Sequence, residues 1–332
     1  MDYFYAGKYS NEGLQVCRLN KPGESHQVPN TSYLCKAGRY LYAVLETAEY
    51  EGQHGGGVAA YEIKADGQLQ LINIVATGGA APCHLVLSPD NRILYVAHYT
   101  DGTTAIFDIA DNGGIGGMRK LIEHRNFGIP SNSHPGRQQR PHAHYAGCWN
   151  DKLWLCDLGL DMVLVLDLDG KLLHKIQTPK GSGPRHLAAH PYLPVIYLVC
   201  ELDCSVISIE WTNSGPVQKG EPVSTLSHPN PKNTCAAIRV SPGGKYLLAS
   251  NRGTDSIAVF RLMADGSISE IAEEIHVNGN CPRDFNFRGN DMVYVACQES
   301  NVINIFRWDE SAGFLTSTGE FINIDSPVCL TF

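Results

Sequence analysis

The stretch PCHLVLSPDNRILYVAHYTDGTTAIFDI, residues 82–109, contains the pattern that decides the fold. An apolar run begins at Pro82, and the turn Ser88-Pro89-Asp90-Asn91 separates it from a second run, Leu94-Tyr95-Val96-Ala97. A third run spans residues 103–109. The runs are rich in β-branched and aromatic residues, and the intervening Pro, Gly, Asp and Asn are typical of short turns. The stretch therefore predicts three consecutive antiparallel strands.

Similar runs recur along the whole chain at a step of roughly fifty residues. The middle run of each copy is centred on an aromatic residue or leucine: Tyr5, Tyr42, Tyr95, Trp154, Tyr197, Leu248 and Tyr294. The run after it covers residues 13–19, 57–63, 103–109, 162–168, 205–211, 256–262 and 302–308. A fourth strand begins after Asp-Gly turns such as Asp66-Gly67 and Asp265-Gly266. Seven such units predict an all-β, seven-bladed β-propeller with four-stranded antiparallel blades.

The two ends of the chain are expected to share one blade. Residues 3–9 read as the second strand of a unit, and residues 327–332 read as a lone first strand. Pairing the N- and C-terminal strands would complete the seventh blade and close the ring, which removes an exposed sheet edge. We expect a single domain over residues 1–332.

Charge and composition exclude several classes of partner. The chain has 34 acidic and 26 basic residues, a formal net charge of -8, which argues against a nucleic-acid partner. No stretch approaches the ~20 apolar residues that span a bilayer, and no signal peptide is recognisable. The 11 cysteines lie singly within apolar runs, without a Cys-x-x-Cys pair. We therefore expect reduced thiols and a cytoplasmic location. We also expect a monomer or small homo-oligomer.

The hairpin geometry gathers scattered polar residues at one edge. The start of a first strand and the end of its second strand lie at the same end of an antiparallel pair. If the first strands line a central channel, these ends from all seven blades meet at one mouth. The second strands contribute Tyr9, Glu46, Tyr99, Leu158, Glu201, Arg252 and Gln298, and one residue earlier His98, Asp157 and Asn251. The first strands contribute His84, His142, His144, Arg185, His186, Arg283 and Asp284.

These residue types suit the chemistry of a small anion. Three arginines at the mouth of an acidic protein can each hold a carboxylate or phosphate by two-point contact. A histidine or glutamate can act as a general base at neutral pH. A structural role is the alternative for each residue taken singly, because polar residues at strand ends often satisfy loop backbone and Arg–Glu pairs can join neighbouring blades.

Other polar residues are expected to be structural. Asp161, Asp203 and Asp255 recur before the third strand and are interpreted as turn caps. His142 and His144 lie on one strand face, but no third ligand has metal-site spacing, so no metal is expected. His124 falls outside the hairpins and carries no functional signal. The sequence has no Gly-x-Ser-x-Gly elbow, so a serine-hydrolase mechanism is not indicated.

Several motifs resemble those of a known family, the lactonase-type seven-bladed propellers. These are the cycloisomerase-like 6-phosphogluconolactonases, related to the 3-carboxy-cis,cis-muconate lactonizing enzyme. The motifs are GGAAPCHL at 78–85, RPHAH at 140–144, DLGLD at 157–161, GSGPRHL at 181–187, ELD at 201–203, SNRGTDSIAVF at 250–260 and the ending SPVC at 326–329. The likeness runs the length of the chain.

The resemblance implies a lactonase without cofactor or metal, acting on a small anionic lactone. Its catalytic residues carry over to His142 or His144, Arg185, Glu201 and Arg252. His84, His186, Asn251 and Arg283 are expected to bind substrate. The expected reaction is hydrolysis of 6-phospho-D-glucono-1,5-lactone in the pentose phosphate pathway, with the general base left open. The alternatives are a carboxymuconate-type lactonizing enzyme and a non-catalytic binding propeller.

Overall fold

The computed structural model describes residues 3–18 and 21–332, and the chain divides into two compact units. The first unit comprises residues 1–177 and 328–332, and the second comprises residues 178–327. Strands dominate the described residues, with two short 3-10 helices at His124–Asn126 and Gln298–Ser300. No helix in this described part is long and apolar enough to cross a membrane. The expectation of one domain over residues 1–332 stays a prediction.

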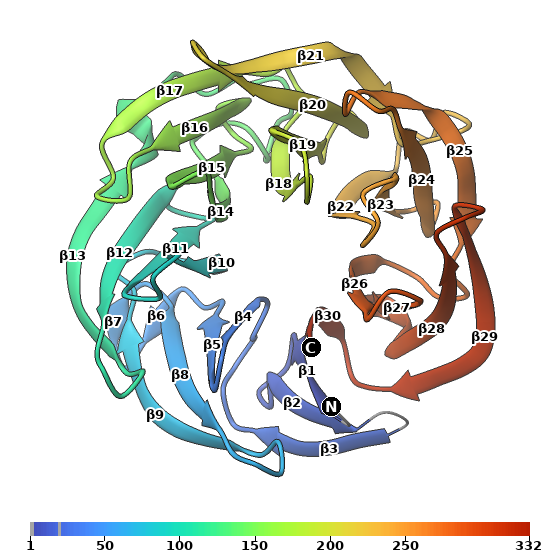
Figure 1. The fold of residues 1–332 in the computed structure, drawn as a ribbon. Helices are drawn as coiled ribbons and strands as arrows, with labels where there is room; N and C mark the ends of the chain where they lie inside the picture. Colours follow the sequence, from blue (N-terminus) through green and yellow to red (C-terminus); the bar gives the residue numbers. More distant parts are fainter. Residues whose placement is uncertain (1–2, 19–20) are drawn as a thin grey trace. The chain divides into compact units, whose positions relative to one another are not determined.

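Four of the seven four-stranded sheets lie in the first unit (Figure 1). They are, in sheet order, β3 (Lys21–His26), β2 (Leu14–Arg18), β1 (Tyr3–Lys8) and β30 (Pro327–Thr331); β4 (Leu34–Ala37), β5 (Tyr40–Leu45), β8 (Gly57–Ile63) and β9 (Leu69–Ala76); β10 (Pro82–Leu87), β11 (Ile93–His98), β12 (Thr103–Ile109) and β13 (Ile115–Glu123); and β14 (Ala143–Trp149), β15 (Lys152–Asp157), β16 (Met162–Leu166) and β17 (Leu172–Gln177). A small hairpin, β6 (Glu49–Tyr50) and β7 (Gln53–His54), is inserted between β5 and β8.

Three sheets make up the second unit. They are β18 (Pro184–Ala189), β19 (Val195–Cys200), β20 (Ser205–Thr212) and β21 (Gly215–Ser224); β22 (Thr234–Val240), β23 (Tyr246–Arg252), β24 (Ser256–Leu262) and β25 (Ile268–His276); and β26 (Pro282–Arg288), β27 (Met292–Cys297), β28 (Val302–Asp309) and β29 (Phe314–Asn323). Neighbouring strands pair antiparallel and follow one another in chain order (Figure 1). This order is that of propeller blades.

The observed strands confirm the predicted fold class, seven four-stranded antiparallel blades. Three of the predicted third strands, 57–63, 103–109 and 256–262, have the observed bounds of β8, β12 and β24. The C-terminal strand β30 pairs with β1, as the half-blade pattern at the two ends predicted. The predicted third strand at 13–19 is observed as Leu14–Arg18, and residue 19 lies outside the described residues.

Burial follows the position of a strand within its blade. The second strands β11 and β19 are buried along their whole length, whereas the middle of the fourth strand β13 is exposed. Side chains of adjacent blades interlock into apolar clusters, such as that joining Tyr95 and Ile106 to Ala146 and Leu164. A strand covered on both faces reads as a nearly continuous apolar run, which explains why the second strands were the clearest repeat in the sequence.

Several of the repeated tyrosines join their blade to the next through one kind of hydrogen bond. In the first unit, the Tyr5 hydroxyl donates to the carbonyl of Gly67 at 3.0 Å, and the Tyr42 hydroxyl donates to that of Gly113 at 2.9 Å. In the second unit, the Tyr197 hydroxyl donates to the carbonyl of Gly266 at 2.9 Å. Each acceptor lies in the turn before the fourth strand of the following blade. The tyrosines that revealed the repeat therefore also set how blades pack.

We expect Tyr197→Phe to destabilise the protein by about 1–3 kcal/mol, because the buried carbonyl of Gly266 loses its donor. Equilibrium denaturation in urea measures the change. Tyr192→Phe is the matched control, since Tyr192 is 73% exposed and its hydroxyl makes a longer bond of 3.4 Å. Equal stability of both variants would show that the hydroxyl does not hold the blades together.

Candidate active site

β-bulges mark the starts of the first strands. The pairing register shifts between Pro82 and His84, between Ala143 and Tyr145, between Pro184 and His186, and between Pro282 and Asp284. The extra residues are Cys83, His144, Arg185 and Arg283. A bulge bends its strand and changes the direction of a side chain, and bulges are frequent next to active sites. Three of the predicted site residues are therefore bulge residues.

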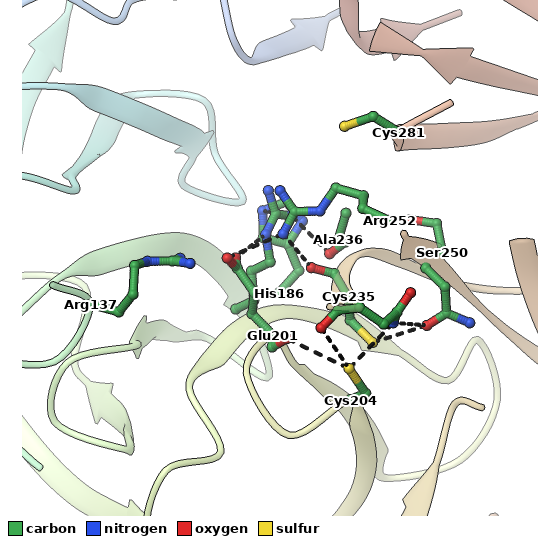
Figure 2. Close-up of polar contacts among 12 residues, drawn as sticks. Arg137, His186, Glu201, Cys204, Cys235, Ala236, Ser250, Arg252 and Cys281 are labelled. Carbon is green, nitrogen blue, oxygen red and sulfur yellow. Dashed lines mark hydrogen bonds and ion pairs between the residues drawn. The ribbon is translucent and has the colours of Figure 1, made fainter. Parts of the chain in front are cut away.

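A buried carboxylate bridges two arginines in the second unit. Oε2 of Glu201 accepts a hydrogen bond from Nε of Arg185 at 2.8 Å, and Oε1 lies 3.1 Å from Nη2 of Arg252. Glu201 and Arg185 are 3% and 2% exposed. Glu201 and Arg252 point toward one another in Figure 2. Arg185 comes from the first strand of a blade, Glu201 follows the second strand of that blade, and Arg252 ends the second strand of the next blade. The hairpin geometry predicted that these strand ends lie close together.

The remaining donors of the two arginines meet backbone carbonyls and a histidine. Nη1 of Arg185 donates to the carbonyl of Ala236 at 2.7 Å and lies 3.3 Å from Nε2 of His186, which must accept. Nη2 of Arg252 donates to the carbonyl of Cys235 at 2.7 Å. Multiple fixed contacts restrict the orientation of each guanidinium. His186, predicted to bind substrate, contacts the catalytic candidate Arg185, and this contact does not test the prediction.

The cluster has one more positive than negative charge, which favours binding of an anion. Glu201 neutralises only one of the two guanidinium charges, and the burial of the group strengthens the field of the other. Nε of Arg252 is buried and has no hydrogen-bond partner among the described residues. An unmet buried donor is unfavourable unless a ligand or water satisfies it. Arg252 therefore has a buried donor that no described residue satisfies.

A pocket of about 330 Å³ adjoins Arg252. Its lining comprises Lys232, Thr234, Arg252, Gly253, Asp255, Asn280, Cys281 and Glu299. Burial raises the pKa of the Cys281 thiol, while the positive charges of Arg252 and Arg283 oppose that rise. Arg283 is not among the lining residues. The volume suits a small ligand such as a sugar lactone.

Asn251 supports the cluster from within the protein. Its side chain is fully buried, and its Oδ1 accepts from Thr225 Oγ1 at 2.7 Å and from Asn233 Nδ2 at 3.1 Å. Its Nδ2 donates to the Thr225 carbonyl at 2.9 Å. These contacts anchor the residue next to Arg252, so we assign Asn251 a positioning role in place of the expected contact with substrate.

The predicted histidines of the first unit surround Tyr99. The His142 ring stacks on the Tyr99 ring with centroids 4.4 Å apart, and the His144 ring meets it edge-on at 5.6 Å. His142 Nδ1 donates to the Tyr99 carbonyl at 2.7 Å. His84 packs between aromatic rings instead, 3.7 Å from Tyr33 and 4.4 Å from Tyr145. The prediction that His84 binds substrate is not tested by these contacts.

The tautomer of His142 suits a general base. Because a carbonyl accepts from Nδ1, that nitrogen carries the proton and the lone pair lies on Nε2. Burial lowers the pKa of His142, so the ring is neutral at pH 7. Oδ1 of Asp157 accepts from the His142 backbone at 2.9 Å and fixes the start of the strand. These features distinguish His142 from His144, which the sequence could not do.

The sequence analysis missed a second buried pair in the first unit. His124, interpreted as carrying no signal, is fully buried, and its Nδ1 lies 2.8 Å from Oδ2 of Asp157. Its Nε2 lies 2.9 Å from Thr104 Oγ1. Since Asp157 also accepts from the His142 backbone, His124 orients the group that positions His142. His124 precedes its partner by 33 residues and belongs to the preceding blade, so no local pattern could reveal it.

The predicted turn caps need one correction. Asp161 and Asp255, at φ 51° and 53°, directly precede β16 and β24, but the equivalent residue before β20 is Cys204, at φ 57°. Asp203 lies one residue earlier, and its Oδ1 accepts from the backbone of Ser205 at 3.1 Å. Asp203 is thus a cap, but not the counterpart of the other two. In residues 3–18 and 21–332, no three His, Cys, Asp or Glu side chains cluster as metal ligands.

Known proteins with similar sequences and structures identify the family. The family model described as Lactonase, 7-bladed beta-propeller matches residues 4–332, and this chain belongs to that family. A 6-phosphogluconolactonase of Bacillus subtilis is 30% identical over 325 residues, covering 95% of this chain and 90% of that protein. The structure of the Pseudomonas aeruginosa periplasmic gluconolactonase PpgL is 28% identical, with a TM-score of 0.90 and coverage of 99% and 98%. A Lactobacillus plantarum protein structure is 26% identical, with a TM-score of 0.90 and coverage of 100% and 99%.

Acid should destabilise the protein through His98, a further residue of the predicted mouth. Complete burial lowers its pKa to about 3. Between the unfolded pKa of about 6.5 and that value, only the unfolded chain binds the proton, so stability falls as pH falls, by up to about 1.4 kcal/mol per pH unit. We expect His98→Asn to flatten this dependence in urea titrations from pH 7 to 4. His228→Asn, at an exposed histidine, is the control and should keep the slope of the parent protein.

Proposed function

We propose that this chain hydrolyses 6-phospho-D-glucono-1,5-lactone to 6-phospho-D-gluconate. The observation that carries the proposal is the Arg185–Glu201–Arg252 cluster, which has surplus positive charge and whose Arg252 lines a pocket of sugar size. Membership of the lactonase family supports lactone hydrolysis as the reaction class. The 6-phosphogluconolactonase of Bacillus subtilis supports the phosphorylated substrate. A cytoplasmic location and a role in the pentose phosphate pathway would follow from this substrate.

The reaction needs a base for water and a donor for the developing oxyanion. Water adds to the lactone carbonyl carbon, the ring C–O bond breaks, and the ring oxygen receives a proton. Arg185 is the proposed oxyanion donor, since a guanidinium held by Glu201 and the Ala236 carbonyl needs little reorganisation. Arg252, with Arg283 and Lys232, is proposed to hold the phosphate. Arginine suits this task because its fork matches phosphate oxygens.

Glu201 and His142 divide the roles that the sequence left open. Both carboxylate oxygens of Glu201 face guanidinium groups, so we assign it to holding Arg185 and Arg252 in place. We assign the general base to His142, whose Nε2 has the free lone pair. The hairpin geometry predicts that His142 acts on the substrate bound by the arginines. Kinetics of the variants tests this prediction directly.

Arg185→Ala should lower kcat by ~10²–10³, because the oxyanion donor acts only in the transition state. Arg252→Ala should mainly raise KM, by roughly tenfold to a hundredfold, since it removes a charged contact made in the ground state as well. His142→Ala should remove the acidic limb of the pH–rate profile, since that limb reports protonation of the general base, whereas Arg252→Ala should retain it. Arg307→Ala, at an exposed arginine of β28, is the control for lost charge. Normal turnover by folded Arg185→Ala would refute the role of Arg185.

Comparison of freshly generated 6-phosphogluconolactone with glucono-1,5-lactone tests the substrate. We expect a higher kcat/KM for the phosphorylated lactone, and Arg252→Ala should reduce this preference. Inorganic phosphate should compete, whereas simple dicarboxylates should not. Rates must be corrected for spontaneous hydrolysis in buffer. Equal rates on both lactones would point to a gluconolactonase, and no acceleration over buffer would refute the proposal.

A further inference from the structure

A pair of thiols lies directly beneath the arginine cluster. The side chains of Cys204 and Cys235 are 6% and 0% exposed. They share the Glu201 carbonyl as a neighbour, which lies 4.0 Å from Cys204 Sγ and accepts from the Cys235 amide at 3.1 Å. Asn233 contacts Cys204 Sγ at 3.3 Å, and Asn251 contacts Cys235 Sγ at 3.3 Å. Figure 2 shows both cysteines next to Glu201 and Arg252. The two sulfurs come from different blades, since Cys204 directly precedes β20 and Cys235 lies in β22.

The backbone conformation of Cys204 is unusual for a cysteine. In five blades the residue directly before the third strand has positive φ: Gly102, Asp161, Cys204, Asp255 and Asn301. Gly, Asn and Asp adopt this left-handed region most readily, and a cysteine there is strained. Strained residues are retained chiefly where they have a function. The backbone turn by itself would favour Asp or Asn at position 204.

Small molecules can reach Cys204 from a second pocket. A cavity of about 360 Å³ is lined by Cys204 together with Asp203, Ser224, Leu226 and Asn233, among others. The Cys235 side chain, by contrast, is fully enclosed. Hydrogen bonds from Cys235 and Asn233 lower the pKa of the Cys204 thiol, which favours the nucleophilic thiolate. Cys204 is therefore the thiol that meets an oxidant, and Cys235 is the one that resolves it.

We propose that Cys204 and Cys235 form a reversible disulfide when a hydroperoxide enters this pocket. The Cys204 thiolate attacks a peroxide oxygen: an S–O bond forms, the O–O bond breaks, and the leaving hydroxide takes a proton to become water. The Cys235 sulfur then attacks the sulfenic acid, so that an S–S bond forms and a second water leaves with the Cys235 proton. Two thiol sulfurs are oxidised and one molecule of hydrogen peroxide is reduced to water.

The disulfide would act on the proposed active site through the backbone of Cys235. Its amide donates to the Glu201 carbonyl at 3.1 Å, and its carbonyl accepts from Arg252 Nη2 at 2.7 Å. A new S–S bond draws Cys235 toward Cys204 and disturbs both contacts. Oxidation is therefore expected to weaken lactone hydrolysis, a consequence that rests on the function proposed above. Formation of the disulfide itself does not depend on that function.

Peptide mapping tests the disulfide without an activity assay. The reduced protein is treated with hydrogen peroxide, remaining thiols are alkylated, and a non-reducing digest is analysed by mass spectrometry. We expect the peptides of Cys204 and Cys235 to become linked before Cys35 and Cys148 are oxidised, although the latter are the more exposed thiols. Oxidation of Cys35 and Cys148 without a Cys204–Cys235 link would overturn the proposal.

Activity then tests the coupling, with each variant compared to its own reduced form. Peroxide should lower lactonase activity of the parent protein roughly tenfold, and dithiothreitol should restore it. Cys148→Ser should behave like the parent, whereas Cys204→Gly and Cys235→Ser should lose the reversible response. Gly102 occupies the equivalent position, so Cys204→Gly suits the backbone. A reversible loss that persists in Cys204→Gly would overturn the proposal, whereas inactivity of the reduced parent would refute only the proposed function.

Discussion

A tyrosine hydroxyl buried between two blades must find an acceptor, and this requirement governs how successive blades pack. Tyr5, Tyr42 and Tyr197 each meet it with a turn carbonyl of the next blade, at Gly67, Gly113 and Gly266. A bond of fixed length at the same strand position sets the stagger of the blades. Tyr197 lies in β19, the strand that Glu201 directly follows, so this contact and the arginine cluster involve the same blade.

Glu201 shows how burial turns a strand-end residue into part of a site. An isolated buried carboxylate is strongly unfavourable, and two arginines from two blades compensate for it. The arrangement leaves one positive charge in excess beside a pocket. The same residues therefore join two blades and attract an anion, so the structural and functional interpretations of the Arg–Glu pairs are compatible. A role in joining blades does not exclude a role in binding.

At the position of positive φ before the third strand, the residue that best suits the backbone turn is not always the residue present. Asp161, Asp255 and Asn301 satisfy the turn with residues that favour this conformation, while Cys204 does not. A repeat makes such a departure visible, because the residue at this position in one blade can be compared with the equivalent residue in the other blades. The departure lies beside Cys235 and beneath Arg252, where its chemistry can reach the site.

The sequence by itself determined the blade class, the bounds of three third strands, the pairing of the terminal strands and the hairpin ends that carry Arg185, Glu201 and Arg252. These features depend on local periodicity and on antiparallel pairing, both of which are legible along the chain. Only the tertiary structure decided that His124 holds Asp157, that Asn251 is enclosed, that His142 has its lone pair on Nε2, and that Cys204 meets Cys235. Those contacts join residues of different strands or blades. Their distances depend on side-chain packing between blades, which has no period in the sequence.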